Sequence, residues 1–516
     1  MKKHLFKSTL VVAAMTAISR VFGLVRDVVF ASMFGAGVGM DAFIVAFRIP
    51  NFMRRIFAEG GFSQAFVPVL SEYREQRTPE EVQALIDQTT ATLGLTVLIT
   101  TVIGVIIAPV VVSVFALGWT FNHDQGKFVL AVEMLRITFP YLVFISLTAL
   151  AGGIFNTYRK FAVPAFTPVL LNLSLIACAI WLAPGFPPEK RIVALAWGVC
   201  IAGVVQLLFQ LPFLRQLRVI PVPRFGRDPE GVRRIFKLLL PMLFAVSITQ
   251  INLLVDTLIA SFLVTSSISW LYYSDRLMEF PLGVFGIALS TVILPGLSAH
   301  YANNAREDYV KTLDWALRWV FLVALPAAFG LALLAQPLLT TIFRYRQFTN
   351  YDVEMAGFSL MAYAVGLPAF ILIKVLATGF FSRQDTATPV KIGAFAMLSN
   401  IVFNLLLVGP LLHAGLALAT SLSAYINAGL LYYYLKKRRH YEFQTGWGRY
   451  FLKLVTALAV MSAMLWHFVP DIDHWYQWSA VARVSRLLFW VVAGAAVYVL
   501  TLLITGIRPR ELITHP

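Results

Sequence analysis

Apolar residues run along the chain in long blocks, and short polar segments separate one block from the next. Most blocks reach the roughly 20 residues that an α-helix needs to cross a bilayer, and they are much longer than the strands of a membrane β-barrel. Because a lipid-exposed segment must satisfy its own backbone hydrogen bonds, the pattern predicts an all-α polytopic membrane protein with about 14 transmembrane helices. Their expected ranges are 8–34, 38–66, 84–117, 128–157, 162–184, 191–216, 233–264, 267–299, 309–335, 353–382, 388–409, 412–435, 449–469 and 482–506.

Composition agrees with this class. Of the 516 residues, 59% are hydrophobic and only 13% are charged, which is about half the charged fraction of a typical soluble protein. The two cysteines, Cys178 and Cys200, lie inside apolar blocks, which favours buried thiols over a disulfide framework or a metal site. The basic start of the chain lacks the small-residue cleavage site of a signal peptide, so we expect a retained first helix.

Basic residues are distributed unevenly between the connecting segments. One set of alternate connections holds most of the lysine and arginine, including the central linker 215–234 and the segment 436–439. The positive-inside rule places these connections and both termini in the cytoplasm, which requires an even number of spans. The formal net charge of +16 therefore reflects membrane topology, and we predict no nucleic-acid partner.

Short motifs recur between the two halves of the chain. PVLS at 68–71 corresponds to PGLS at 295–298, and Pro164 corresponds to Pro389, both at an offset of roughly 225 residues. This offset places six spans in each repeat, and repeats of an even number of spans share their orientation in the membrane. The prediction is two six-helix lobes, 1–220 and 221–440, followed by two extra transmembrane helices in 441–516.

The stretch from Arg20 to Ser63 carries charges inside apolar spans. A charge at membrane depth costs at least about 2.5–3.5 kcal/mol, so such a residue normally faces a cavity or a partner. One helical face is shared by four of these residues, which are spaced by seven, seven and four: Asp41, Arg48, Arg55 and Glu59.

Arg20 and Asp27 are also seven residues apart and are expected to pair along their helix. Arg26 and Arg54 then remain to meet an anionic ligand in a water-filled, cationic cavity. The alternative is a structural ion-pair network with no ligand.

The second half has a charged stretch of its own at the start of the eighth span. Four of its residues join the candidate substrate-binding set, the last of them from the tenth span: Asp275, Arg276, Glu279 and Lys374. Arg136 and Arg318 lie near span ends, where we expect their side chains to snorkel to the interface.

A different polar group lies in spans seven, eleven and twelve. Asp256 is the single acid in an apolar segment, and three oxygen-bearing side chains accompany it: Asn400, Asn404 and Thr420. A buried carboxylate with amide and hydroxyl oxygens suits Na⁺, or a proton on the carboxylate itself. The alternative is a hydrogen-bonded group that packs helices together.

No enzyme signature stands out. The eight histidines lie mainly in loops and at chain ends, and there is no metal-ligand spacing, nucleophile elbow or phosphate-binding glycine loop. Without a base near the arginines, covalent or general-base chemistry has little support, and we predict a protein that is not an enzyme.

Four motifs resemble one known family, the MurJ (MviN) family of lipid II flippases, and the likeness extends over essentially the whole chain. They are SRVFGLVRD, DAFIVAFRIPNFMRRIFAEGGFSQAFVP, YYSDRLMEFPLGVFGIAL and FFSRQDTATPVKI. The resemblance implies a fold of the multidrug/oligosaccharidyl-lipid/polysaccharide exporter type, with two lobes around a central cavity and a lipid-tail groove formed by the last two helices. Family-essential positions are matched by Arg20, Arg26, Asp41, Arg54 and Arg276, and Asp256 with its oxygen-bearing partners resembles a sodium site proposed within the family.

The resemblance also implies the activity. The substrate is lipid II, an undecaprenyl-pyrophosphate that carries a disaccharide-pentapeptide, moved from the cytoplasmic to the periplasmic leaflet for peptidoglycan synthesis. The location is the bacterial cytoplasmic (inner) membrane, where the expected partners are lipid II, membrane lipids and other cell-wall synthesis and division proteins. No cofactor is expected, and the sequence leaves open whether transport is coupled to Na⁺, to a proton or to the membrane potential.

Three other functions remain open at this point. A drug or polysaccharide-precursor exporter of the same fold would not need so cationic a cavity. A membrane enzyme acting on a lipid pyrophosphate would need a base or a metal site. A scaffold in a wall-synthesis complex would not need charges inside its spans.

Overall fold

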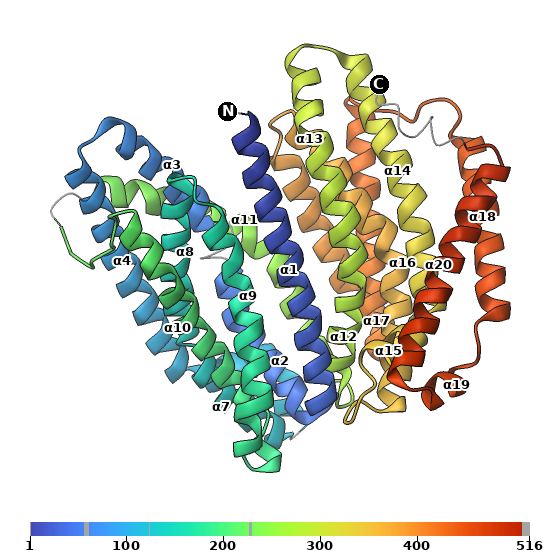
Figure 1. The fold of residues 1–516 in the computed structure, drawn as a ribbon, viewed down its shortest axis with the longest axis horizontal. Helices are drawn as coiled ribbons and strands as arrows, with labels where there is room; N and C mark the ends of the chain where they lie inside the picture. Colours follow the sequence, from blue (N-terminus) through green and yellow to red (C-terminus); the bar gives the residue numbers. More distant parts are fainter. Residues whose placement is uncertain (1, 56–60, 123, 227–229, 508–516) are drawn as a thin grey trace. The chain divides into compact units, whose positions relative to one another are not determined.

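The computed structural model describes residues 2–55, 61–122, 124–226 and 230–507. Almost all of these residues are helical, and the described part contains no strand. The chain divides into two compact units, residues 1–266 and residues 267–516, which we call the first and second units. Most of their helices are labelled in Figure 1.

The first unit contains eleven α-helices among its described residues. Within it, α1 packs against α9, α10 packs against α8 and α9, α2 packs against α7, and α11 packs against α3. The bounds of these helices are α1 Lys2–Phe34, α2 Val38–Arg54, α3 Gly61–Gln76, α4 Pro79–Ile106, α5 Ala108–Phe115, α6 Leu117–Phe121, α7 Gln125–Thr138, α8 Tyr141–Thr157, α9 Ala162–Ala177, α10 Val193–Gln216 and α11 Glu230–Ala260.

The second unit is arranged around α16. This helix packs against α12, α13, α14, α15 and α17, whereas α18 and α20 pair with each other and reach α14 and α15. The bounds are α12 Ser267–Pro281, α13 Ile287–Ala302, α14 Arg306–Leu333, α15 Ala335–Ile342, α16 Asn350–Phe381, α17 Ala387–Lys437, α18 Trp447–Phe468, α19 Ile472–Gln477 and α20 Ala480–Ile504.

The helices have the lengths and surfaces of membrane spans. Ten helical segments in the described ranges are long and apolar enough to cross a membrane. One of them, the 51-residue α17, bends at Leu412, where φ is 50°, and therefore comprises two spans. With α1, α2 and α11 added, the helices agree with the predicted all-α fold of about 14 spans. In the most apolar 18-residue segment of α20, only 17% of the residues are buried, as expected for a helix that faces lipid.

Some expected spans are broken into two helices. The third, expected at 84–117, contains the end of α4 at Ile106 and the start of α5 at Ala108. The second, expected at 38–66, includes residues 56–60, which lie outside the described part. The fourth is interrupted between Thr138 and Tyr141, where Pro140 lacks the N–H that would continue the helical ladder. The lobe boundary expected near residue 220 stays a prediction, because the contacts of α11 group this helix with the first unit.

The internal repeat recurs in the backbone at two helix ends. After α8 and α16, Arg159 and Gln384 adopt left-handed conformations with φ of 59° and 61°. The next residues, Lys160 and Asp385, donate their N–H to the carbonyl five residues earlier, at 2.8 and 3.1 Å. Each pair of equivalent residues is 225 positions apart, and this bond is the 6→1 hydrogen bond of a Schellman cap.

The same cap closes the last helix of each repeat. After α10 and α17, Arg218 and Arg439 have φ of 57° and 56°. Val219 and His440 then donate to the carbonyl five residues earlier, at 3.2 and 2.8 Å. The two units therefore share this local helix end as well, at an offset of 221 residues, close to the one that the sequence motifs predicted.

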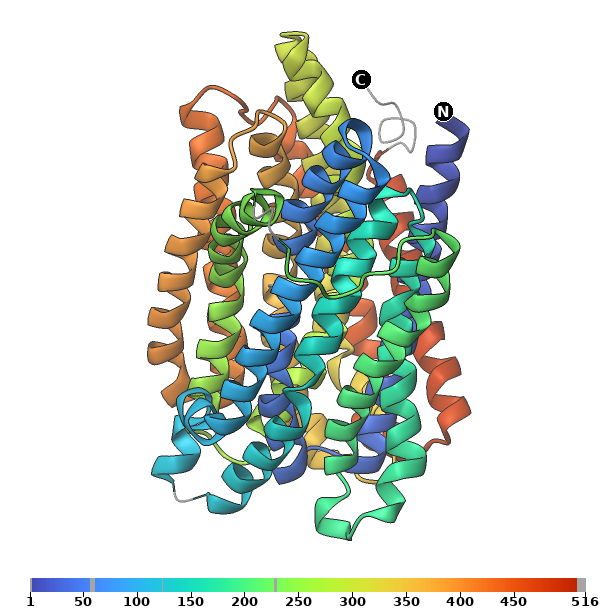
Figure 2. The same cartoon turned by 90° about the vertical axis from the view of Figure 1, so that its left-hand side faces the viewer.

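The linker after α10 is fixed to the side of the first unit. The buried Asp87 carboxylate on α4 accepts a hydrogen bond from the N–H of Val222 at 2.9 Å, and Gln83 donates to the carbonyl of Ile220 at 2.7 Å. Figure 2 shows this linker as a green coil that crosses the neighbouring helices. The connection before α11 is therefore held along its course by side chains of α4.

Candidate functional site

Arg26 on α1 lies at the centre of a buried polar group. Its Nε and Nη2 donate to Asp27 Oδ1 at 2.9 and 2.7 Å, and its Nη1 donates to Asn172 Oδ1 on α9 at 3.0 Å. The residue is 8% exposed, and its guanidinium lies 5.6 Å from the centre of the Phe30 ring. Asn172 in turn donates to the carbonyl of Ser19 at 3.1 Å, which joins α1 to α9.

This arrangement corrects the expected pairing of Arg20 with Asp27. Asp27 is buried and pairs with Arg26, whereas the side chain of Arg20 is exposed. Seven residues correspond to about 10.5 Å along a helix, so a neighbouring guanidinium that folds back reaches the carboxylate more readily. Arg26, expected to meet a ligand, is engaged by protein side chains in this conformation.

Two charged residues of α2 contact the end of α11 and the segment that follows it. Asp41 is buried, and its Oδ2 accepts a hydrogen bond from the backbone N–H of Ser266 at 2.7 Å. Arg48, two turns further along, donates to the hydroxyl of Thr257. Both contacts lie within the first unit, so these residues connect α2 to the chain around Asp256.

Arg54 ends α2, and Arg55 forms its cap. The Nε and Nη2 of Arg54 donate to the amide oxygen of Asn51 at 3.0 and 2.9 Å. A neutral amide orients a guanidinium without neutralising its charge. Glu59, expected on the face of Asp41 and Arg48, lies outside the described residues.

The charged stretch of the second unit lies on α12. Arg276 pairs with Glu279 at 2.8 Å, and its guanidinium lies 4.9 Å from the centre of the Tyr272 ring. Asp275 precedes it on the same helix, and Lys374 has an exposed side chain on α16, against which α12 packs. These residues belong to the second unit, whereas those of the Arg20–Arg55 stretch belong to the first.

Three of the four residues expected to bind a cation are in contact. Asn404 donates to Asn400 at 2.8 Å, and Asn400 donates to the Thr420 hydroxyl at 3.2 Å. All three lie on α17, on either side of its bend at Leu412, so they also hold its two halves together. Asp256 belongs to the first unit, and its part in a cation site stays a prediction.

A polar cluster that the sequence analysis missed surrounds Asp314 on α14. Its carboxylate accepts hydrogen bonds from Tyr441, Trp447 and Arg318 at 2.7, 2.7 and 2.8 Å. The Arg318 guanidinium also lies 5.1 and 5.4 Å from the ring centres of Trp447 and Tyr450, so it is packed, whereas we had expected it to snorkel. The four-residue spacing of Asp314 and Arg318 on one helix was the available signal.

Burial and the hydrogen bond to Asp314 raise the pKa of the Tyr441 hydroxyl, so this group stays a donor at physiological pH. Tyr441 precedes α18, Trp447 begins it, and Asp314 lies on α14. The cluster therefore anchors the start of the two C-terminal helices to the rest of the second unit. We interpret it as structural.

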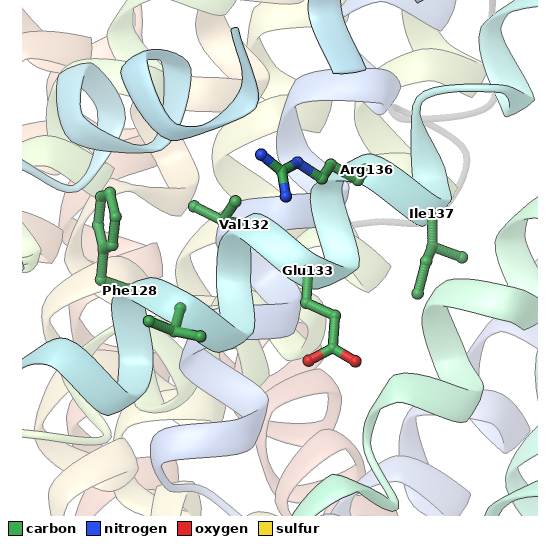
Figure 3. Close-up of a pocket in the computed structure, with 6 residues that line it drawn as sticks. Phe128, Val132, Glu133, Arg136 and Ile137 are labelled. Atoms are coloured by element: carbon green, nitrogen blue, oxygen red, sulfur yellow. The ribbon is translucent and has the colours of Figure 1, made fainter. Parts of the chain in front are cut away.

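A shallow pocket of about 360 Å³ lies along α7 and is mostly apolar. Figure 3 shows its two charged residues, Glu133 and Arg136, pointing in different directions from the helix. Glu133 pairs with Lys190 at 2.9 Å, and Arg136 is exposed, as a snorkelling side chain would be. The divergent charges do not converge on one ligand, so we assign this pocket no function.

Comparison with solved structures identifies the class of protein. The chain is similar to a multidrug resistance MATE family transporter of the MOP superfamily in an inward-facing conformation, with a TM-score of 0.66 and 16% identity over 83% of this chain and 97% of the other. This similarity establishes a multispan transporter fold. A structure of "Lipid II flippase MurJ, inward closed conformation" matches more fully, with a TM-score of 0.81 and 26% identity over 98% of this chain and 100% of the other.

Residues 30–504 match the family described as "Lipid II flippase MurJ", and the chain belongs to this family. It is 47% identical to the "Probable lipid II flippase MurJ" of Haemophilus influenzae, over 97% of this chain and 100% of the relative. It is 40% identical to the "Lipid II flippase MurJ" of Burkholderia cenocepacia, over 98% of both chains. The resemblance that the four motifs indicated is confirmed.

Proposed function

We propose that the protein is a lipid II flippase that moves the lipid-linked peptidoglycan precursor from the cytoplasmic to the periplasmic leaflet by alternating access. The observation that carries the proposal is membership of the MurJ family along nearly the whole chain. The location of arginines within apolar helices of both units supports it, because such charges require a polar cavity or a partner.

The chemistry of the substrate fits these residues. A pyrophosphate is a concentrated anion, and the planar guanidinium of arginine donates to phosphate oxygens in pairs. The headgroup cannot cross hydrocarbon unaided, so a cationic cavity replaces part of its hydration shell. We propose that the following residues line or support that site: Arg20, Arg26, Asp41, Arg48, Arg54, Arg55, Glu59, Asp275, Arg276, Glu279 and Lys374.

Transport by this route makes and breaks no covalent bond. The headgroup has to be held in one facing state and released in the other, so its contacts must be exchangeable. Arg26 provides such an exchange, because a pyrophosphate oxygen could replace the neutral Asn172 amide while the Asp27 contact keeps the guanidinium in place. The last two helices, α18 and α20, would guide the undecaprenyl chain, as the family resemblance implies.

Coupling to an ion is a second part of the proposal. Asn400, Asn404 and Thr420 would complete a Na⁺ site with Asp256, or the carboxylate would carry a proton. Arg48 on α2 donates to Thr257, the residue after Asp256, so a proposed substrate-binding residue contacts α11 next to the proposed ion-binding carboxylate. Ion binding biases the facing state only if its affinity differs between the two states. The membrane potential is the alternative source of energy.

Three other functions compete with flipping. A multidrug exporter shares the fold, but membership of the MurJ family favours lipid II as the substrate. A membrane enzyme would require a chemical step, for which the sequence shows no metal-ligand spacing and no nucleophile elbow. A scaffold of a wall-synthesis complex would associate with other wall-synthesis and division proteins without moving lipid, and such partners stay a prediction.

Reconstitution separates these functions. Purified protein in phospholipid vesicles should move fluorescent lipid II between leaflets. The movement of undecaprenol, which lacks the pyrophosphate, should be the same with and without the protein. Sodium, proton and potential gradients are then imposed singly. Chemically altered lipid II would indicate an enzyme, and unchanged leaflet distribution under every gradient would refute the flippase proposal.

The proposed orientation has both termini in the cytoplasm. Of two introduced single cysteines, one beside Arg438 should be shielded from an impermeant thiol reagent in intact cells, and one beside Asn122 should react. The reverse pattern would overturn the orientation. The wild-type cysteines, which lie inside α-helical or π-helical segments of spans, provide the background.

A further inference from the structure

Four arginines gather at one end of the second unit, apart from the charged stretches discussed above. They come from the start of α14, the connection between α16 and α17, and the segment after α17. We call this group, together with the adjacent His440, the span-end cluster: Arg306, Arg383, Arg438, Arg439 and His440.

Arg383 is held by stacking. Its guanidinium lies 4.9 Å from the ring centre of Tyr301 and 4.6 Å from that of Tyr309. The Tyr309 hydroxyl donates to the carbonyl of Gly379 at 2.6 Å, which fixes this ring. Among the described residues, the side chain of Arg383 makes no hydrogen bond and no ion pair, and its Nε is inaccessible. The site thus orients a cation and supplies no anion for it.

In the described part of the chain, the neighbouring arginines pair with a single carboxylate, that of Asp385. Arg438 pairs with Asp385 at 2.6 Å and donates to the Thr388 hydroxyl at 3.0 Å. Arg306 donates to the backbone carbonyl of Arg439 at 3.0 Å, so it is bonded to a neutral group. The side chain of Arg439 itself is exposed and has no bonded partner in the described part of the chain.

The pKa of the His440 imidazole reflects the excess of positive charge in the cluster. Burial, followed by the positive charges of Arg383, Arg438 and Arg306, lowers the pKa of this imidazole to about 4, and only Asp385 opposes the effect. The electrostatic potential within the cluster is therefore positive.

Exposed aromatic and aliphatic side chains lie near Arg383, Tyr301 through the stacking described above and Phe381 and Val390 along the sequence. Tyr301 is 44% exposed, Phe381 is 43% exposed and Val390 is 42% exposed, and these lie at the ends of α13, α16 and near the start of α17. Cationic groups at the ends of spans beside exposed aromatic and aliphatic residues are typical of the boundary between headgroups and acyl chains. A ligand that matches both has an anionic head and a hydrocarbon tail.

We propose that the span-end cluster binds the phosphodiester group of an anionic glycerophospholipid. Arg439 and the Nη atoms of Arg383 donate to the phosphate oxygens, and the acyl chains lie along Phe381 and Val390. The paired donors of arginine match phosphate oxygens, and stacking on two tyrosines reduces the entropy lost when Arg383 binds. This site is separate from the residues proposed for the lipid II headgroup.

The test measures equilibrium binding of fluorescent phosphatidylglycerol to the full-length protein in detergent. Wild-type protein should bind it with at least about tenfold higher affinity than fluorescent phosphatidylcholine, which has no net charge. The double variant Arg383→Gln/Arg439→Gln should lose this preference. The single variant Arg439→Gln should weaken binding, and its matched control is Arg449→Gln, which removes an equal charge from an exposed residue at the start of α18 and should leave affinity within about twofold.

A second variant guards against misfolding. Arg439→Glu changes only an exposed side chain, so it should keep the wild-type melting temperature and still weaken binding of phosphatidylglycerol. Equal loss in Arg449→Gln would mean that net charge attracts the lipid, and the proposal would be wrong. Displacement of the probe by millimolar inorganic phosphate would identify a free-phosphate site and would also overturn it.

Competition with lipid II separates this proposal from the proposed function. Arg54→Ala, which removes a proposed headgroup contact, should leave probe binding at the cluster unchanged. If lipid II displaces the probe from wild-type protein and from Arg54→Ala alike, the cluster belongs to the substrate route and is not an independent phospholipid site. Failure of flipping with normal probe binding would refute only the flippase proposal.

Discussion

Arg26 in the first unit and Arg318 in the second each pair with an aspartate of their own helix, at 2.7 and 2.8 Å. The two pairs differ in what else contacts them. The Asp314 carboxylate beside Arg318 also accepts hydrogen bonds from Tyr441 and Trp447, which belong to a later part of the chain. The Arg26 guanidinium instead donates to the neutral amide of Asn172.

This difference separates an anchor from a candidate ligand-binding group. Around Asp314 the extra donors converge on the carboxylate, so protein groups satisfy its negative charge. These hydrogen bonds hold α14 to α18. The Asn172 amide beside Arg26 is a neutral acceptor, which orients the cation and which a stronger anionic acceptor could displace. An ion pair inside a span therefore does not define a role until the other contacts of both partners are known.

The largest expected effect is at Asp314. Asp314→Ala leaves Tyr441, Trp447 and Arg318 without their acceptor, and removing one partner of a buried pair costs about 3–5 kcal/mol. We expect a large fall in the melting temperature of the purified protein in detergent. The control is Asp308→Ala, an exposed acid on the same helix, which should change little. A wild-type melting temperature for Asp314→Ala would mean that the cluster is not an anchor.

An intermediate effect is expected at Asp256, beside the Arg48–Thr257 contact. Removing the carboxylate charge by Asp256→Asn should abolish any sodium dependence of flipping and lower the rate at saturating sodium by about tenfold or less, because the headgroup contacts remain. The proton alternative predicts a change in the pH dependence of transport with no response to sodium. If the Asp256→Asn variant transports like wild type at every sodium concentration and every pH, Asp256 is only a packing residue.

The smallest effect concerns His440, whose folded-state pKa is about 4, below the ordinary 6.5, because of burial and neighbouring arginines. Between these values the unfolded chain binds a proton that the folded chain does not, so stability falls as the pH drops from about 6.5 towards 4. Since the side chain is partly exposed, we expect a loss of about 1 kcal/mol or less. Melting temperatures of His440→Gln should depend less on pH than those of wild type; identical profiles would contradict this.

Much of the fold follows from local patterns in the sequence. Apolar block length predicted the spans, because a bilayer imposes a minimum helix length, and the repeated motifs predicted equivalent helix ends, which the structure shows after α8 and α16. Helix breaks were less predictable. The break at Pro140 reflects a missing N–H donor, but α14 continues through Pro326.

The polar contacts were harder to predict because they join distant segments. Arg26 and Asn172 are brought together by the packing of α1 on α9, and Asp314 and Trp447 by the packing of α14 on α18. Spacing along one helix suggested Arg20 as the partner of Asp27 and gave no reason to expect Arg26. A single sequence carries the chemistry of each side chain but not the tertiary contact that decides its use.

Arg54 tests the central claim most directly, because its guanidinium is oriented by the neutral amide of Asn51. The measurement is the rate of lipid II flipping in vesicles by wild type, Arg54→Lys, Arg54→Ala and the surface control Arg449→Ala. We predict wild-type rates for Arg449→Ala, partial activity for Arg54→Lys, which keeps the charge but not the paired donors, and a loss of at least about 100-fold for Arg54→Ala. A folded, membrane-inserted Arg54→Ala variant that flips lipid II at the wild-type rate would contradict the cationic-cavity mechanism.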